Sequence, residues 1–344
     1  MQIGIESRVG LTNFTCEGEE RILFAGLRAG LTLPYDCATG TCGMCKARVR
    51  SGTVETIWPE APAFAKLQRD KGDILMCQTR ATGDCVLRVP ANVVPSAATP
   101  PQYRTGVVRH VEKLTHDVMH FEIALPAPMS FDAGQFVVMN VGGLAGGRSY
   151  SMVNHEGSVE TLELVLKRKP GGAVSDWLFS ADRTGQEAKI FGPLGRATLR
   201  PHEDRDLVCI AGGSGIAGIL SILEHATACG HFERHKGQVY FGVRTLADGF
   251  YLDRLSRHVE AAKGALRVVL ALSHETVNAP SHPKFPHIGV ATGFVHDVAG
   301  SLLDADCAGT AAFVAGPPPM VDGAIRVLLG HNVPSTSIRY DKFG

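Results

Sequence analysis

The chain lacks an excess of either charge, and it lacks any long apolar stretch. Its 34 Lys and Arg residues equal its 34 Asp and Glu residues, so nothing favours nucleic acid or an anionic lipid surface as a partner. No apolar run approaches the ~20 residues that span a bilayer. The first residues read as a strand rather than as a basic, apolar signal peptide. We therefore expect a cytoplasmic protein with neither nucleic-acid nor membrane partners, and we expect it to be a monomer.

The length of the chain and one stretch of its composition predict several domains. Its 344 residues are more than one hydrophobic core organises. A stretch rich in proline and small residues and free of charge begins at Pro90 and reads as an extended tether. We expect a first domain at 1–92, a linker at 93–102, a second domain at 103–200 and a third at 201–344.

The cysteines carry the strongest chemical signal in the chain. Three fall at C-x4-C-x2-C spacing and a fourth follows after a folded interval: Cys37, Cys42, Cys45 and Cys77. This is the plant-type spacing of [2Fe–2S] ligands, in which two irons take four thiolates. Disulfides are one alternative, which a reducing compartment disfavours. Zinc is the other, although its sites usually bring C-x2-C twice and this chain has one such pair.

The pattern around these cysteines predicts a small α+β domain. Apolar alternation at the start indicates a strand, residues 21–30 indicate a short helix that ends at a glycine, and residues 46–56 read as a hairpin around Ser51 and Gly52. The L-P-Y-x-C-x4-C-G-x-C-K stretch resembles a plant-type ferredoxin domain, which implies a β-grasp fold. Residues 1–92 hold 11 Lys and Arg against 10 Asp and Glu, so we expect an apolar or mixed docking surface over the cluster loop.

The second domain shows short strand patterns with turn signals between them, which predicts an antiparallel barrel. An arginine, an aromatic and a hydroxyl alternate along one strand, at Arg148, Tyr150 and Ser151. They offer charge to a phosphate, a face to a flat ring and a hydrogen bond. Downstream, a glycine pair runs into a short helix, a favourable seat for an anion. The residues of this stretch are Lys167, Gly171, Gly172, Val174 and Ser175.

In this order the motifs resemble the flavin domain of ferredoxin–NADP reductases. The resemblance implies that Arg148 binds the FAD pyrophosphate, that Tyr150 stacks on the isoalloxazine and that Ser151 hydrogen-bonds near flavin N5. It places the glycine pair and the helix start against phosphate. FAD is favoured over FMN on the same grounds.

The third domain opens with a strand, a glycine-rich turn and a helix. The turn holds Gly212, Gly213, Ser214, Gly215 and Ile216. Gly213, Gly215 and Gly218 satisfy the G-x-G-x-x-G dinucleotide fingerprint in the right strand–turn–helix setting. The next strand ends with Arg244 where an acidic residue should hold the ribose, so an ordinary Rossmann site would be incomplete.

The same residues are similar to the nicotinamide domain of the reductase family, an α/β fold with a parallel sheet. In that family Arg244, Asp248 and Phe250-Tyr251 face the adenosine ribose. The turn Gly316-Pro317-Pro318 resembles the family's C-G-P-P turn beside the nicotinamide, with Ala315 in place of the cysteine. The C-terminal stretch resembles the family ending that lies against the flavin. Ser151, Asp341 and Phe343 are therefore the candidate catalytic residues, which would tune the flavin.

The resemblance covers essentially the whole chain and implies a multidomain reductase component of bacterial oxygenases. NADH would supply two electrons, and FAD followed by the cluster would pass them singly to a terminal oxygenase. The acceptor would be an aromatic-ring dioxygenase or a hydroxylase, in aromatic hydrocarbon catabolism. One alternative keeps the electron path but serves a deoxysugar dehydratase, and another is a passive iron–sulfur carrier. The intact glycine turn argues against the passive carrier, and Asp248 favours NADH over NADPH.

Overall fold

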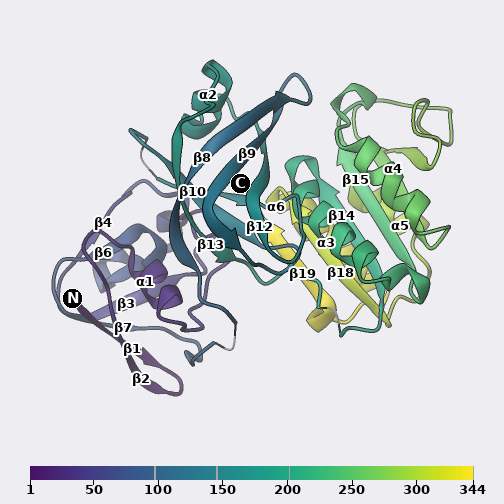
Figure 1. Ribbon diagram of the computed structural model, residues 1–344. Helices are drawn as coiled ribbons and strands as arrows, with labels where there is room; N and C mark the ends of the chain where they lie inside the picture. Colours follow the sequence, from purple (N-terminus) through teal and green to yellow (C-terminus); the bar gives the residue numbers. More distant parts are fainter. Residues whose placement is uncertain (97, 145, 201, 344) are drawn as a thin grey trace. The chain divides into compact units, whose positions relative to one another are not determined.

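The computed structural model describes residues 1–96, 98–144, 146–200 and 202–343 (Figure 1). By its contacts the chain divides into two units. The first combines residues 1–104, 137–149 and 189–194, and the second contains the remaining described residues.

A five-stranded sheet and one α-helix organise the N-terminal residues. In spatial order the strands are β2 (Gly10–Thr15), β1 (Gln2–Ser7), β7 (Cys85–Arg88), β3 (Lys46–Ser51) and β5 (Asp73–Leu75). The helix α1 (Ile22–Arg28) buries every residue except its last. It ends before Gly30, which has a φ of 77°, the left-handed conformation that suits glycine at a helix end.

The predicted hairpin at 46–56 is wrong. The strand β3 pairs with β5 and β7, whereas β4 (Val54–Thr56) pairs with β6 (Thr79–Ala81) in a separate two-stranded sheet. Gly52 makes the turn with a φ of 87°, and a Cβ there would lie 2.1 Å from the carbonyl oxygen of Asp84. The turn therefore exists, but it redirects the chain to a partner far along the sequence.

The proline-rich stretch is fixed at its start to the end of α1. The amide of Thr32 donates to the carbonyl of Val94 at 2.9 Å, and the amide of Ser96 donates to the carbonyl of Gly30. The hydroxyl of Thr32 also accepts a hydrogen bond from the amide of Val94. The start of the expected tether is therefore hydrogen-bonded to the residues that follow α1.

A six-stranded antiparallel sheet follows, and the division into two units runs through it. Its order is β11 (Arg148–Ser151), β10 (Phe136–Val141), β13 (Glu187–Leu194), β8 (Gln102–Lys113), β9 (Val118–Met129) and β12 (Val159–Lys167). The strands β8, β10, β11 and β13 have residues in both units. A short helix, α2 (Ala173–Ser180), follows β12.

The C-terminal sheet is parallel throughout. Its order is β17 (Ile288–Thr292), β16 (Leu266–Leu272), β15 (Gly237–Val243), β14 (Asp206–Gly212), β18 (Thr310–Gly316) and β19 (Ile338–Lys342). Figure 1 shows the last two strands in yellow, side by side at the end of the chain. Each pairing places neighbouring strands in the same direction, as expected for strands linked by helical crossovers.

Helices cover both faces of this parallel sheet. On one face, α3 (Ile216–Ala228) and α4 (Leu252–Ala261) share a core with the sheet and with Val118, Val153 and Val165. On the other face, α5 (Val295–Leu302) and α6 (Pro318–Gly330) pack against it. Within the second unit the sheet residues around β12 and the parallel domain therefore share one apolar core.

Candidate functional site

The four cysteines converge in the first unit. Cys37, Cys42 and Cys45 lie in the loop between α1 and β3, and Cys77 lies in the single turn η3 (Met76–Gln78). The Sγ atoms of Cys45 and Cys77 are 3.1 Å apart. All nine cysteines of the chain fall within the described residues and are free. The disulfide alternative thus finds no support in the geometry.

Main-chain amides point at the sulfur atoms of this loop. The amides of Thr39 and Cys42 donate to Sγ of Cys37 at 3.5 and 3.4 Å, and the amide of Met44 donates to Sγ of Cys42 at 3.5 Å. The hydrogen bond with the Cys42 thiol, ahead of the amide contacts, lowers the pKa of Cys37 to about 4. Amides aimed at sulfur stabilise thiolates, the ligand form of cysteine.

Two glycines make this loop possible. Gly40 and Gly43 have φ values of 91° and 89°, in the left-handed region where other residues are strained. A Cβ at Gly40 would lie 2.9 Å from Cγ of Gln78. The loop therefore has no room for a side chain on its inner side.

Buried polar atoms without partners gather beside these ligands. Seven such side-chain atoms occur among the described residues, and three of them belong to Arg21 and Gln78. Gln78 follows Cys77 directly and is 1% exposed. Unpaired buried polar atoms are rare and need an explanation. Four converging thiols with amides directed at sulfur and orphaned polar groups around them fit a [2Fe–2S] cluster.

The strand β11 presents the R-S-Y-S stretch, and its residues make different contacts. The guanidinium of Arg148 donates to the carbonyl of Gly147 at 2.9 Å and lies over the Trp58 ring at 5.6 Å. The ring of Tyr150 meets Phe121 edge-on at 5.8 Å. Ser151 is buried, and its Oγ would lie 3.7 Å from a Cβ at Gly218 in α3.

Ser149, which the sequence did not single out, joins this strand to the cysteine loop. Its hydroxyl donates a hydrogen bond of 2.6 Å to the main-chain oxygen of Cys37. The two residues are 112 positions apart in sequence, and both belong to the first unit. Alternation along a strand predicts that Ser149 faces away from Arg148 and Tyr150, but nothing local names its partner.

The expected anion seat lies at the start of α2. Gly171 has a φ of 74° and Gly172 is the N-cap. The hydroxyl of Ser175 hydrogen-bonds to the carbonyls of Lys169 and Gly172, both at 2.9 Å. The carboxylate of Asp176 accepts the amide of Gly171 at 3.1 Å. Val174 is buried behind this turn. The carboxylate of Asp176 thus already occupies one amide at this helix start.

An open cavity of about 570 Å³ lies at the carboxyl ends of the parallel strands in the second unit. Such a volume suits a cofactor-sized ligand. Nine of the predicted residues line it: Lys167, Gly212, Gly213, Ser214, Gly215, Arg244, Gly316, Pro317 and Phe343. Ile216 is instead fully buried in the core, and Pro318 is the first residue of α6. Asp248 and Phe250 also line the cavity.

Close approach of two main-chain segments shapes this cavity. A Cβ at Gly215 would lie 2.2 Å from the carbonyl oxygen of Ala315 and 2.6 Å from its carbonyl carbon. Only glycine permits this contact between the turn after β14 and the end of β18. Lys167 forms an ion pair of 2.9 Å with Asp117, so its ammonium is held at the edge of the cavity.

The end of the chain is an ordered strand beside the cavity. β19 pairs with β18, and Asp341 lies opposite Ala315 and is buried. The amide of Phe343 donates to the carbonyl of Gly316 at 3.0 Å. The candidate residues Asp341 and Phe343 are thereby fixed next to the Gly316-Pro317 turn.

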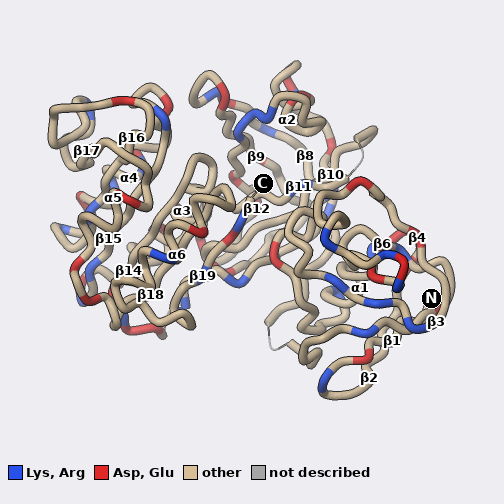
Figure 2. The backbone as a smooth tube through the Cα atoms, turned by 180° about the vertical axis from the view of Figure 1, so that it is seen from behind, with Lys and Arg blue, Asp and Glu red and all other residues tan. Residues whose placement is uncertain are grey.

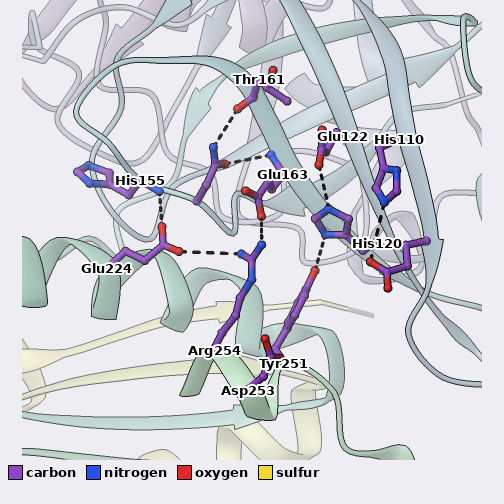
Figure 3. Close-up of polar contacts among 12 residues, drawn as sticks. His110, His120, Glu122, His155, Thr161, Glu163, Glu224, Tyr251, Asp253 and Arg254 are labelled. Atoms are coloured by element: carbon purple, nitrogen blue, oxygen red, sulfur yellow. Dashed lines mark hydrogen bonds and ion pairs between the residues drawn. The ribbon is translucent and has the colours of Figure 1, made fainter. Parts of the chain in front are cut away.

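A network of titratable side chains joins β9 and β12 to α3 and α4 within the second unit (Figure 3). Nδ1 of His120 is 2.7 Å from the hydroxyl of Tyr251, and Arg254 donates to Glu163 at 2.6 Å. Arg254 also lies 3.9 Å from Glu224, whose pKa burial raises to about 7. The family pattern placed Tyr251 with Phe250 at the coenzyme. In the structure Tyr251 contacts His120 instead, and of the two only Phe250 lines the cavity.

Sequence and structure comparisons extend to the whole chain. Family models match a 2Fe-2S iron-sulfur cluster binding domain at 9–82, an oxidoreductase FAD-binding domain at 105–199 and an oxidoreductase NAD-binding domain at 209–326.

Three relatives are similar over nearly their full lengths. The ferredoxin–NAD(+) reductase component of an alkene monooxygenase system from Xanthobacter autotrophicus is 36% identical, with 96% of this chain and 98% of the relative covered. A ferredoxin–NAD(P)(+) reductase of Metapseudomonas resinovorans is 32% identical, with 96% of each covered. The solved structure of a ferredoxin reductase in carbazole 1,9a-dioxygenase aligns with a TM-score of 0.86 at 31% identity, covering 100% of this chain and 99% of that one.

Proposed function

We propose that this chain, which belongs to the NAD(P)H-dependent reductase components of oxygenase systems, takes its electrons from NADH and releases them at the site formed by Cys37, Cys42, Cys45 and Cys77. It is an oxidoreductase with a [2Fe–2S] cluster, FAD and a nicotinamide coenzyme, and it transfers electrons from NAD(P)H to an oxygenase. The multidomain fold class expected from the sequence is confirmed. The residues that perform each task are our proposals.

The cluster ligands in this proposal are Cys37, Cys42, Cys45 and Cys77. Their convergence and the amides directed at the sulfurs support this assignment. A cluster that stays bound needs ligands in fixed positions, and these positions and the hydrogen bonds to sulfur set its potential. The packed loop around Gly40 meets this need.

The flavin in this proposal is FAD. When bound, it would accept two electrons from the coenzyme and release them one at a time. Arg148 would neutralise the pyrophosphate and Tyr150 would offer its ring face. Ser151 would hydrogen-bond to the flavin ring, whereas Asp341 and Phe343 would limit access of water to it. Gly172, Val174 and Ser175 would shape the phosphate seat at α2, and Asp176 would have to give up the amide of Gly171.

The hydrogen bond from Ser149 to Cys37 is the observation that carries the proposed electron route. Ser149 lies between the two proposed flavin-binding residues Arg148 and Tyr150 in β11, and its 2.6 Å bond ends on a cluster ligand. Electronic coupling falls off more slowly through bonds and hydrogen bonds than through empty space. A short bonded connection therefore leads from the flavin strand to the cluster loop.

Replacing Ser149 tests this route. Ser149→Ala should slow cluster reduction after mixing with NADH, followed by stopped-flow absorbance, while NADH-driven ferricyanide reduction at the flavin continues at the wild-type rate. Ser158→Ala, at an exposed serine just before β12, is the matched control and should match the wild type in both rates. If the cluster in Ser149→Ala protein were reduced at the wild-type rate, the proposed route through Ser149 would be wrong.

The coenzyme in this proposal is NADH. The glycine turn at Gly212–Ile216 would hold the pyrophosphate, and Arg244 and Asp248 would lie near the adenosine ribose. Asp248 accepts hydrogen bonds from the amide and hydroxyl of Thr245 at 3.0 and 2.9 Å, so its carboxylate is held in place. A fixed negative charge there disfavours an additional 2′-phosphate.

The acceptor in this proposal is a hydroxylating oxygenase. The relatives include reductase components of an alkene monooxygenase system and of propane 2-monooxygenase, and a ferredoxin reductase of carbazole 1,9a-dioxygenase. Around the cluster loop Met44 is 52% exposed. Figure 2 shows basic and acidic residues both present along the chain near α1, β3 and β6. A mixed surface with an apolar centre suits a partner that docks transiently.

We further propose a cytoplasmic monomer whose partners include neither nucleic acid nor membrane. The nine free cysteines agree with a reducing compartment. Among the described residues, no helix combines the length and apolarity that crossing a bilayer demands. Sedimentation of the purified protein tests the monomer, and reconstitution with candidate oxygenases tests the acceptor.

A visible spectrum tests the core of the proposal. Purified protein should show flavin and iron–sulfur bands together, and NADH should bleach both. A protein with flavin bands alone would contradict the cysteine assignment, and failure of NADH to bleach either would contradict the coenzyme site.

A further inference from the structure

Arg21 is a buried cation for which the described chain provides no counter-charge. It directly precedes α1 and is only 9% exposed. Its Nη1 atom has no hydrogen-bond partner in the described part of the chain, and no described carboxylate forms an ion pair with it. Burying an unpaired charge costs several kcal/mol in general, so such a group is retained where something else compensates it.

One contact of the guanidinium and two contacts of the backbone around it fix the place of Arg21. It lies over the ring of Phe24, 5.3 Å from the centroid. The main chain of Arg21 forms an isolated β-bridge with Arg80. The helix α1, which Arg21 begins, packs against the turn η3 that carries Cys77. Arg21 is therefore held on the side of the cysteine loop from which Cys77 enters.

Unpaired polar atoms also occur in the turn η3 that carries Cys77. Gln78, the next residue, has both side-chain amide atoms unpaired. The orphaned groups thus surround one ligand.

A [2Fe–2S] cluster would supply the missing negative charge. Two ferric ions, two sulfides and four thiolates carry two net negative charges, and one added electron makes three. The potential of such a cluster depends on nearby charge, hydrogen bonds and solvent exposure. A buried guanidinium interacts with it through a medium of low dielectric constant and favours the state with the larger negative charge.

We propose that Arg21 is the buried counter-charge of the cluster and sets its reduction potential. The inference rests on the proposed assignment of Cys37, Cys42, Cys45 and Cys77 as ligands. Arg21 is a positioning and tuning residue that acts on the cluster through its charge. The added electron resides on iron, and Arg21 neither gains nor loses a proton.

The alternative source of negative charge for Arg21 is a phosphate of FAD. The charge of Arg148, the proposed pyrophosphate ligand, also acts on Arg21. An arginine pair could bind a pyrophosphate together. Loss of Arg21 would then weaken flavin retention and leave the cluster potential unchanged.

The test is a redox titration of the full-length protein, followed by the EPR signal of the reduced cluster, with FAD and iron contents measured alongside. Arg21→Gln should lower the equilibrium constant for one-electron reduction of the cluster about tenfold, which shifts the reduction potential by about 59 mV to a more negative value. Arg21→Lys should stay near the wild-type potential because the charge remains. Arg50→Gln, which removes an exposed arginine 3.7 Å from Glu6, is the control and should not shift it.

An Arg21→Gln protein with full iron content and the wild-type potential would overturn the proposal, as would loss of FAD with an unchanged potential. If Arg21→Gln protein fails to hold the cluster, Arg21→Lys decides. Retention at the wild-type potential supports a role of charge, and equal loss of the cluster overturns it. If wild-type protein itself gives no cluster signal, the ligand assignment fails instead.

Discussion

The loop that carries Cys37, Cys42 and Cys45 is closely packed, whereas the cavity at the ends of β14, β15 and β18 is open. Around the loop, amides are 3.4–3.5 Å from sulfur and a Cβ at Gly40 would have no room. The cavity leaves about 570 Å³. The first suits a group that stays bound, and the second suits a coenzyme that enters and leaves in every turnover.

The two regions also differ in what specifies them. In the proposed assignment, the cluster depends on four side chains that would bond to metal, so one substitution should abolish it. The proposed coenzyme site depends mainly on main chain at Gly212–Gly215 and Gly316, so side-chain changes should have graded effects. Three predictions test this difference, and a fourth concerns Glu224, which belongs to neither region.

Cys77→Ser should have the largest effect. Loss of one of four ligands should remove the cluster or its function, and electron delivery to a protein acceptor should fall to background. NADH-dependent ferricyanide reduction should persist because it needs only the flavin. Cys229→Ser, at an exposed cysteine, is the control. If both activities vanished in Cys77→Ser protein that still carried FAD, the proposed division of labour would fail.

Gly215→Ala should lower kcat/KM for NADH on the order of 10²-fold, because a displacement of about 1 Å at a reacting centre costs that much. The added Cβ would lie 2.2 Å from the carbonyl oxygen of Ala315, so the main chain must shift. Gly309→Ala, where no atom lies within 4 Å of the new Cβ, should be neutral. Wild-type kinetics in Gly215→Ala protein would contradict the close approach.

The coenzyme preference should be about tenfold in kcat/KM for NADH over NADPH, about 1.4 kcal/mol. The carboxylate of Asp248, held by Thr245, repels a 2′-phosphate. Asp248→Asn should narrow the preference while keeping an oxygen to accept from Thr245. Comparable values for the two coenzymes in the wild type would reverse the assignment.

Glu224 should produce the smallest effect, visible in the pH dependence of stability. Burial raises the pKa of this carboxyl from 4.5 to about 7, so the folded protein keeps a proton that the unfolded chain has released. Stability should therefore fall as pH rises from about 4.5 through 7. Partial exposure of Glu224 reduces the effect to about 1 kcal/mol, or about 2–4 °C in Tm.

Glu224→Gln should remove this fall between pH 5 and pH 8, measured by thermal unfolding, because glutamine does not titrate. The carbonyl oxygen of glutamine can still accept the amide of His155, which Glu224 accepts at 2.8 Å. Glu160→Gln, at an exposed glutamate, serves as the control. If Tm fell by the same amount between pH 5 and pH 8 in the wild type and in Glu224→Gln protein, Glu224 would not be the cause of the fall.

The sequence predicted what short-range rules determine. Cysteine spacing, the glycine turn after β14 and the alternation along β11 are local patterns with chemical reasons. The hairpin at 46–56 failed because β4 finds its partner β6 some twenty residues later, a pairing that no local signal reports. Ser149 and Arg21 were missed for a related reason, since their roles depend on what tertiary packing brings against them.

The contacts of Tyr251 could not be predicted from the sequence either. The family pattern implied a place beside Phe250 at the coenzyme, and the chain direction turns it away. Tyr251 has a φ of 56°, and its hydroxyl reaches His120 on β9. A conformational detail of one residue thus moves a side chain from a binding cavity to a contact with another sheet.

The arginines stacked on the two tryptophans have a practical consequence for spectroscopy. The chain contains two tryptophans. Trp58 lies in the first unit under Arg148, and Trp177 lies in the second under Arg183, 4.8 Å from its ring centroid. Trp58→Phe and Trp177→Phe would each leave one tryptophan, so that tryptophan emission reports on one unit at a time. Trp58, beside a proposed pyrophosphate ligand, would also report when the flavin binds.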